Sequence, residues 1–174
     1  FKNPERENYK ITDISFAYFA TGNVAISRDL LLKAGLFDTS FSLYGWEDLE
    51  LGERLKKMGT RLIKCPKAVG FHWHPPFECD QIPSIINKEY ERARMALIFY
   101  KKHRNLRVRF TIQFTFIHRL LWRILTIGGF ITIERILPFL KFLINSKRNN
   151  FALELVRIPL NLIYVEELYN ESKK

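Results

Sequence analysis

The segment from Tyr44 to Gly59, YGWEDLELGERLKKMG, constrains the fold most, because it has the pattern of one amphipathic helix with a defined end. Four residues recur at helical spacing and share one face: Asp48, Leu51, Leu55 and Met58. Gly59 follows the last turn, where glycine tolerates the left-handed residue that closes a helix. Two i,i+4 ion pairs are expected on the solvent face: Glu50 with Arg54, and Glu53 with Lys57. The pattern predicts a helix over residues 46–58.

An acidic pair, Glu47 and Asp48, stands in the first turn of this predicted helix, directly after Gly45 and Trp46. On the inward face, the Asp48 carboxylate is expected to look into a cleft, where it can take a proton from a substrate hydroxyl. The alternative is that first-turn carboxylates only complement the helix dipole. The preceding glycine and indole favour a site, because a sugar ring stacks on a broad aromatic face that the backbone can approach closely.

Size and cysteine content set the limits of the class. The chain has 174 residues, 47% of them apolar, which is enough for one domain and a tail. It begins at Phe1 without an initiator methionine, so we expect a fragment. Cys65 and Cys79 are 14 residues apart and form no CxxC pattern. Neither a zinc ribbon nor a disulfide framework is indicated, which points to a reducing, cytoplasmic compartment.

Basic residues are concentrated between residues 88 and 147. This segment has 13 basic and 3 acidic residues, an excess equal to the net charge of +10 of the whole chain. Such a field attracts anionic surfaces. The uncharged run 124–133 is too short to span a bilayer. Apolar stripes flanked by basic residues instead predict helices that lie in the interface of a membrane, at its inner face. Packing on the domain or on a second subunit is the alternative, and no pattern of a nucleic-acid-binding motif is present.

Aromatic and β-branched runs predict strands before and after the central helix. Residues 16–26 predict a buried strand, interrupted at Thr21-Gly22-Asn23, and residues 60–64 and 68–74 predict two more. Between them, Ser27 is expected to cap a short helix over residues 28–34. Helices are also predicted over 83–104, within 106–145 and over 151–172, the last bent or broken at Pro159.

Two histidines, His72 and His74, share one face of the last predicted strand. Imidazoles placed in this way at a strand end can supply metal ligands. Polar residues on a solvated strand face are the alternative explanation.

Taken in order, three motifs resemble the C-terminal half of the family 2 inverting glycosyltransferases, which have the GT-A fold. They are TGNVAISRDLLLKAGLFD, YGWEDLELGERLKKMG and a strand ending in HWHP, and Gly45-Trp46-Glu47-Asp48 is the most specific part. The resemblance covers about residues 16–105. It implies an α/β fold, namely the acceptor-side part of a Rossmann-like GT-A domain over residues 1–105, followed by a basic helical tail over residues 106–174.

The resemblance also implies a role for each candidate site residue. Asp48 corresponds to the catalytic base. Acceptor binding is assigned to five residues: Glu47, Trp46, Gly45, Asn23 and Gly22. His72, with His74 as the next candidate, would bind the divalent metal (Mn²⁺ or Mg²⁺) that carries the nucleotide diphosphate.

One part of the family pattern is missing, because no Asp-x-Asp metal motif occurs in the chain. We therefore expect sugar transfer from a nucleotide-sugar donor to a saccharide or another hydroxyl acceptor, in partnership with an N-terminal donor-binding half. The fragment alone is expected to be inactive. The alternative from another class is a non-catalytic membrane-surface or scaffolding module that acts through its basic tail.

Overall fold

A computed structural model describes residues 19–63, 65 and 67–174, which separate into two compact units. The first contains the described residues up to Ser40 together with residues 46–73. The second contains residues 41–45 and 74–174. These units do not test the predicted domain boundary between residues 105 and 106, which stays a prediction.

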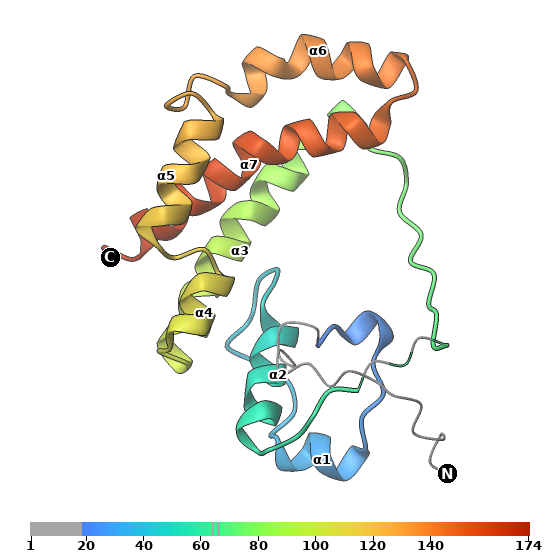
Figure 1. The fold of residues 1–174 in the computed structure, drawn as a ribbon, viewed down its shortest axis with the longest axis vertical. Coiled ribbons are helices and arrows are strands. Elements are labelled where there is room, and N and C mark those ends of the chain that lie inside the picture. The colour runs from blue at the N-terminus through green and yellow to red at the C-terminus, as the bar shows by residue number, and fades with distance from the viewer. Residues whose placement is uncertain (1–18, 64, 66) are drawn as a thin grey trace. The chain divides into compact units, whose positions relative to one another are not determined.

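The first unit is built on two helices, and both were predicted (Figure 1). Helix α1 covers Arg28–Lys33, and Ser27 caps it by accepting a hydrogen bond from the backbone N–H of Leu30 at 3.3 Å. Helix α2 covers Glu47–Lys57 and is followed by Gly59 at a φ of 78°. The small core has four buried members: Phe19, Ala34, Leu51 and Leu55.

The prediction that Glu50 and Glu53 lie on the solvent face of α2 is wrong. Glu50 and Glu53 are buried, with exposed fractions of 1% and 3%. The predicted pair of Glu50 with Arg54 is confirmed, because Arg54 Nε donates to the two carboxylate oxygens at 3.0 and 2.9 Å. The same guanidinium donates to the carbonyl oxygens of Ala34 and Leu36. Arg54 therefore neutralises a buried carboxylate and binds the carbonyl groups that follow α1.

The α/β expectation is wrong, since the described part of the chain contains no strand. Around the short helix η2 (Thr21–Asn23) the backbone is extended, at φ −127° and ψ 121° for Ala20 and φ −138° and ψ 144° for Val24. Extended backbone becomes a strand only when a neighbour satisfies its N–H and C=O groups. Neither this run nor residues 60–63 and 68–74 have such a neighbour among the described residues, and residues 16–18 and 64 lie outside them.

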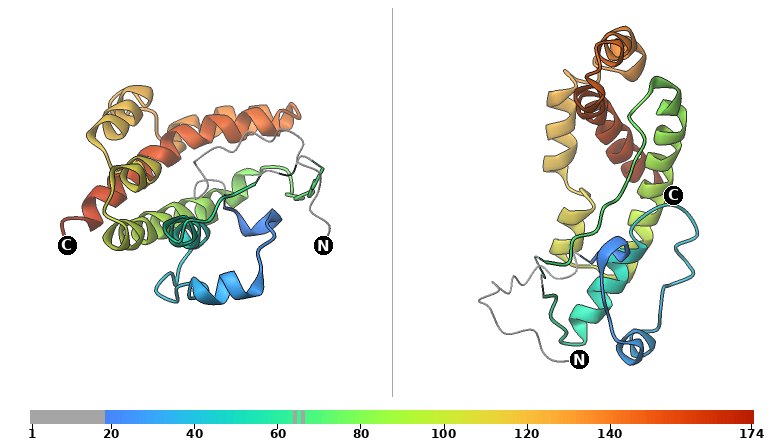
Figure 2. Two further views of the ribbon diagram at one scale, coloured as in Figure 1. Left: turned by 60° about the horizontal axis from the view of Figure 1, so that its bottom comes forward. Right: turned by 90° about the vertical axis from the view of Figure 1, so that its right-hand side faces the viewer.

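The second unit is helical. After the short helix η3 (Cys79–Gln81), its helices are α3 (Ile82–Lys102), α4 (Leu106–Thr111), α5 (Phe116–Leu125), α6 (Ile133–Asn145) and α7 (Asn149–Glu171). The helices predicted over 83–104, within 106–145 and over 151–172 are confirmed. Figures 1 and 2 show α7 running beside α3 and contacting α5 and α6.

Helix α7 organises this unit because side chains along its whole length are buried. At its N-terminal half, Ala152, Val156 and Leu160 pack with Leu140 and Leu143 of α6. Pro159 is buried within the helix and does not break it, contrary to one of the two predicted outcomes. Packing of α7 on α3, α5 and α6 gives the apolar burial that offsets the hydrogen bond lost at a proline.

Tyr164 is the largest buried side chain of α7, and it joins three elements. Its hydroxyl donates to the carbonyl oxygen of Ile112 at 2.8 Å. The Arg92 guanidinium of α3 lies 4.3 Å from the centre of its ring. Burial raises the pKa of the Tyr164 hydroxyl, which therefore stays a hydrogen-bond donor at neutral pH.

Candidate functional site

The backbone that leads into α2 is left-handed at two consecutive residues. Gly45 has a φ of 100° and Trp46 a φ of 76°. A Cβ at position 45 would lie 3.2 Å from Cγ of Arg92, so both the dihedral angle and the space favour glycine. For tryptophan the left-handed region costs about 1–2 kcal/mol. Strain of this kind is concentrated at functional sites, and here it fixes the direction in which α2 starts.

Asp48, in the first turn of α2, is held by Thr21. One carboxylate oxygen, Oδ2, accepts hydrogen bonds from the backbone N–H and the hydroxyl of Thr21, both at 3.0 Å. The second oxygen, Oδ1, accepts no hydrogen bond from the described residues. The carboxylate is thus oriented through one oxygen, and its other oxygen has acceptor capacity left for a ligand.

The Thr21-Gly22-Asn23 turn also contacts the segment that leads to His72. The Asn23 side-chain amide donates to the carbonyl oxygen of Ala68 at 3.0 Å. A Cβ placed on Gly70 would lie 3.5 Å from the same amide group. The turn therefore joins two segments that are distant in sequence, the start of α2 and residues 68–70.

Glu47, the other member of the acidic pair, is partly buried. Its Oε2 atom is buried and has no hydrogen-bond partner among the described residues. A buried carboxylate oxygen without a donor is costly, on the order of 1–3 kcal/mol or more. Glu47 Oε2 is therefore an acceptor whose partner the described residues do not supply.

The predicted site residues are distributed between the two units. Trp46, Glu47, Asp48, Gly22 and Asn23 belong to the first unit, as does His72, whereas Gly45 and His74 belong to the second. Both histidines are exposed. The described residues contain no group of three or more histidine, cysteine or acidic side chains that could hold a metal ion. The described residues by themselves therefore do not form a metal site. The assignment of His72 and His74 as metal ligands stays a prediction.

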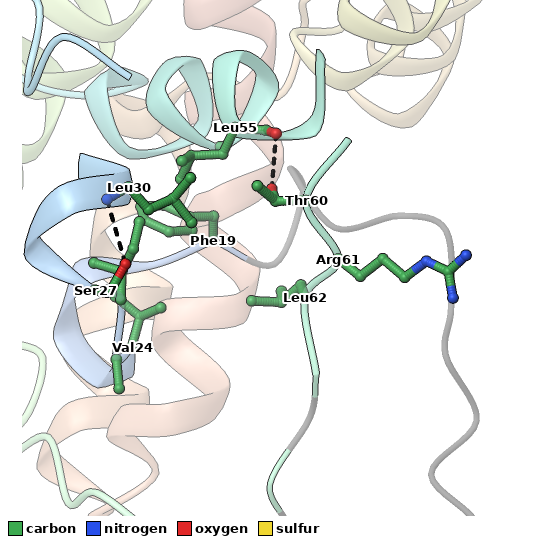
Figure 3. A pocket seen from close by; sticks show the side chains of 11 residues that line it. Phe19, Val24, Ser27, Leu30, Leu55, Thr60, Arg61 and Leu62 are labelled. Carbon is green, nitrogen blue, oxygen red and sulfur yellow. Dashed lines mark hydrogen bonds between the residues drawn. The ribbon is translucent and has the colours of Figure 1, made fainter. Parts of the chain in front are cut away.

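A small pocket of about 190 Å³ lies elsewhere in the first unit (Figure 3). Phe19, Val24, Leu30, Leu55 and Leu62 make its lining largely apolar. The acidic pair does not contribute to it, so the cleft expected beside Asp48 is not this pocket. Ser27, Thr60 and Arg61 also line it. The Ser27 hydroxyl caps α1, and the Thr60 hydroxyl donates to the carbonyl oxygen of Leu55 at 2.7 Å.

Thr21 was not among the residues assigned to the site from the sequence, although the turn that contains it was noted. It lies 27 residues before its partner Asp48. No periodicity relates two residues at that separation. Only the order of the motifs, which placed the turn near the cleft, pointed to it.

Replacing Thr21 by valine should lower kcat about tenfold if Asp48 is the base, because the carboxylate loses one of the two hydrogen bonds that hold its orientation. Thr21→Ser, which keeps the hydroxyl, is the matched control and should restore most of the activity. The measurement is kcat and acceptor KM for both variants. An equal loss in both variants, or a change in KM alone, would contradict a positioning role for the hydroxyl.

Comparison with known proteins places the similarity among glycosyltransferases. The hyaluronan synthase of Pasteurella multocida is 39% identical over 70 residues, which are 40% of this chain and 7% of the synthase. The chondroitin synthase of Escherichia coli is 37% identical over 76 residues, 44% of this chain and 11% of that protein. A glycosyltransferase of Bacillus subtilis, YfnE, is 31% identical over 90 residues, 52% of this chain and 21% of the relative.

The chain thus spans between 7% and 21% of the length of these relatives. No family model matches the chain. No solved structure matches it either. The relatives support the resemblance to glycosyltransferases. The assignment to family 2 rests on the motifs alone.

Proposed function

We propose that this chain carries the acceptor-side part of an inverting glycosyltransferase, with Asp48 as the base. The observation that carries the proposal is the Asp48 carboxylate, which Thr21 holds through Oδ2 and whose Oδ1 accepts no hydrogen bond from the described residues. The relatives support the class, since two of them are a hyaluronan synthase and a chondroitin synthase.

In the proposed step an acceptor hydroxyl attacks the anomeric carbon of a nucleotide sugar. The new C–O bond forms while the bond to the nucleoside diphosphate breaks, which inverts the configuration at that carbon. The hydroxyl proton passes to Oδ1 of Asp48, and the bonding electrons leave with the diphosphate. A positioned base contributes to such a step only in the transition state, so its contribution appears in kcat.

Acceptor binding is proposed for the residues around this carboxylate. Glu47 has a buried oxygen that can accept a hydrogen bond from a sugar hydroxyl. Trp46, held in a left-handed conformation, would offer its indole to a sugar ring. Gly22 and Asn23 lie in the turn that supports Asp48. A saccharide with two neighbouring hydroxyls suits this arrangement, one for the base and one for Glu47.

The test is a transfer assay on an active form of the protein, in which the chain is joined to a donor-binding half, with a panel of nucleotide sugars and oligosaccharide acceptors. Product formation is followed by mass spectrometry, and nucleoside diphosphate release is followed separately. The proposal predicts an acceptor-dependent product with inverted anomeric configuration. A product with retained configuration would contradict a single displacement with one base.

Replacing Glu47 by glutamine should raise the acceptor KM several-fold and leave kcat nearly unchanged, because the contact is made equally in the ground and transition states. The glutamine keeps the size of the side chain and one carbonyl oxygen. The measurement is a saturation curve in acceptor at fixed donor. A large fall in kcat with an unchanged KM would instead place Glu47 in the chemical step.

A further inference from the structure

Helix α5 presents its charged side chains to the protein. Arg119 Nη2 lies 2.7 Å from Oε2 of Glu166 on α7, and Arg123 Nε lies 2.9 Å from Oε1 of the same carboxylate. The Arg119 guanidinium also lies 4.9 Å from the centre of the Tyr169 ring. Two basic residues at i and i+4 thus clamp one carboxylate, and this clamp fixes which side of α5 faces α7.

Two other polar side chains of α5 are also bonded within the unit. His118 Nδ1 lies 2.6 Å from the hydroxyl of Thr115, the N-cap residue. The Trp122 indole N–H donates to Oε1 of Gln113 at 2.6 Å. The hydrogen bonds from Arg119 and Arg123 lower the pKa of the Glu166 carboxyl, so the clamp stays ionised at neutral pH. These contacts oppose rotation of α5 about its axis.

The apolar side chains of α5 are consequently exposed, and none of its residues is buried. The exposed fractions are 71% for Phe116, 65% for Ile117 and 64% for Ile124. Leu120, Leu121 and Leu125 are also exposed, at 45%, 44% and 43%. The exposure continues into the following turn with Ile127 and Phe130, at 68% and 61%. We refer to these eight side chains as the α5 apolar face.

A helix on a water-soluble surface buries its apolar stripe. In α5 the apolar stripe is exposed and the charged side faces α7, although Arg123 is itself 53% exposed. Contiguous apolar surface of this extent marks a binding face for a protein or a membrane. Charge separates a second copy of this chain from an anionic membrane as the partner. Residues 74–174 contain 17 basic and 9 acidic residues, a net charge of +8. A second copy would bring two such charges together, whereas an anionic bilayer would be attracted.

Basic residues also flank the α5 apolar face along the chain. Arg107 and Arg109 of α4 precede it, and Arg135 and Lys141 of α6 follow it, all four exposed. In the described residues no helix is both long and apolar enough to cross a membrane. Apolar side chains beside basic ones on short helices are typical of segments that lie in the interface of a bilayer.

We propose that the α5 apolar face docks on an anionic membrane surface, with its side chains in the interfacial region and the flanking arginines and lysine near lipid head groups. The partner is therefore a lipid bilayer with acidic head groups. The proposal does not depend on the glycosyltransferase assignment, because none of its residues belongs to the Asp48 site.

The test is co-flotation of the chain with vesicles of phosphatidylcholine containing 30% phosphatidylglycerol, compared with pure phosphatidylcholine, at low and high salt. We expect binding that requires the anionic lipid and weakens at least fivefold as salt rises. The double variant Leu121→Glu, Ile124→Glu should bind at least tenfold more weakly. Both positions are exposed, so the variant is expected to keep its helical circular dichroism spectrum and its melting temperature.

The matched control is the double variant Ser84→Glu, Asn170→Glu, which adds the same two charges at exposed helical positions of the same unit. It should lose no more than about threefold, since only long-range attraction changes. If the glutamate variant of α5 unfolds, Leu121→Ser, Ile124→Ser replaces it with the same expectation. The proposal is overturned if the unmodified chain ignores anionic vesicles, or if the α5 and control variants bind alike. Dimerisation that the α5 variant abolishes, without vesicle binding, would show that the face joins two copies.

Discussion

Replacing Asp48 by asparagine should reduce the turnover of sugar transfer by about 10² to 10⁴, the usual contribution of a positioned general base. Asparagine keeps the shape of the side chain and an oxygen that can accept both hydrogen bonds from Thr21. It cannot accept the proton of the acceptor hydroxyl. Donor affinity should hardly change, because the proposed role concerns the acceptor. The measurements are kcat, donor dissociation constant and melting temperature in an active form of the protein.

The control for Asp48 is Asp29, which stands in the first turn of α1 and is exposed. If Asp48 only complements a helix dipole, Asp48→Asn and Asp29→Asn should behave alike. Each would cost about 0.3–1 kcal/mol of unfolding free energy and leave turnover intact. A stable Asp48→Asn protein with unchanged kcat would end the catalytic assignment. A fall in kcat limited to Asp48→Asn would support it.

The helices were predictable because their signals are local. Ser27 before α1 and Gly59 after α2 mark the helix ends at the positions found in the structure. The burial of Leu51 and Leu55 follows from their spacing. Local chemistry alone accounts for these elements, so a single sequence was sufficient.

The strand predictions failed because a strand depends on its neighbours. Alternation of apolar and polar residues gives the two faces of an extended segment but not the partner that completes its hydrogen bonds. In the predicted strand over residues 68–74, the apolar residues Val69, Phe71 and Trp73 are all exposed. Their pattern indicated extended backbone, and the hydrogen-bonded ladder that makes a strand does not occur in the described residues.

The acidic pair of the candidate site was chosen from the sequence and stays a prediction, whereas its support by Thr21 was missed. Gly45 through Asp48 were chosen from their residue types and order. The hydrogen bonds from Thr21 to Asp48 could not be predicted, because they join residues separated by 27 positions. The burial of Glu50 was also missed, since an i,i+4 ion pair has the same sequence pattern on a wet face as on a buried one.

Replacing Arg54 by alanine should cost about 3 kcal/mol or more in the free energy of unfolding, the range for removing one partner of a buried ion pair. The Glu50 side chain, which is only 2% exposed, would lose the guanidinium that pairs with it. The carbonyl oxygens of Ala34 and Leu36 would lose a charged donor as well. Urea unfolding followed by circular dichroism measures the change.

Two variants show whether the buried charge causes this loss. Arg28→Ala removes an exposed arginine from the same unit and should change the unfolding free energy by no more than about 0.5 kcal/mol. The double variant Glu50→Met, Arg54→Met removes both charges and keeps apolar volume, so it should recover much of the stability lost in Arg54→Ala. If the double variant is as unstable as Arg54→Ala, the hydrogen bonds to the two carbonyl groups would be the main contribution. If Arg54→Ala has the same free energy of unfolding as the unmodified chain, the ion pair does not contribute to stability.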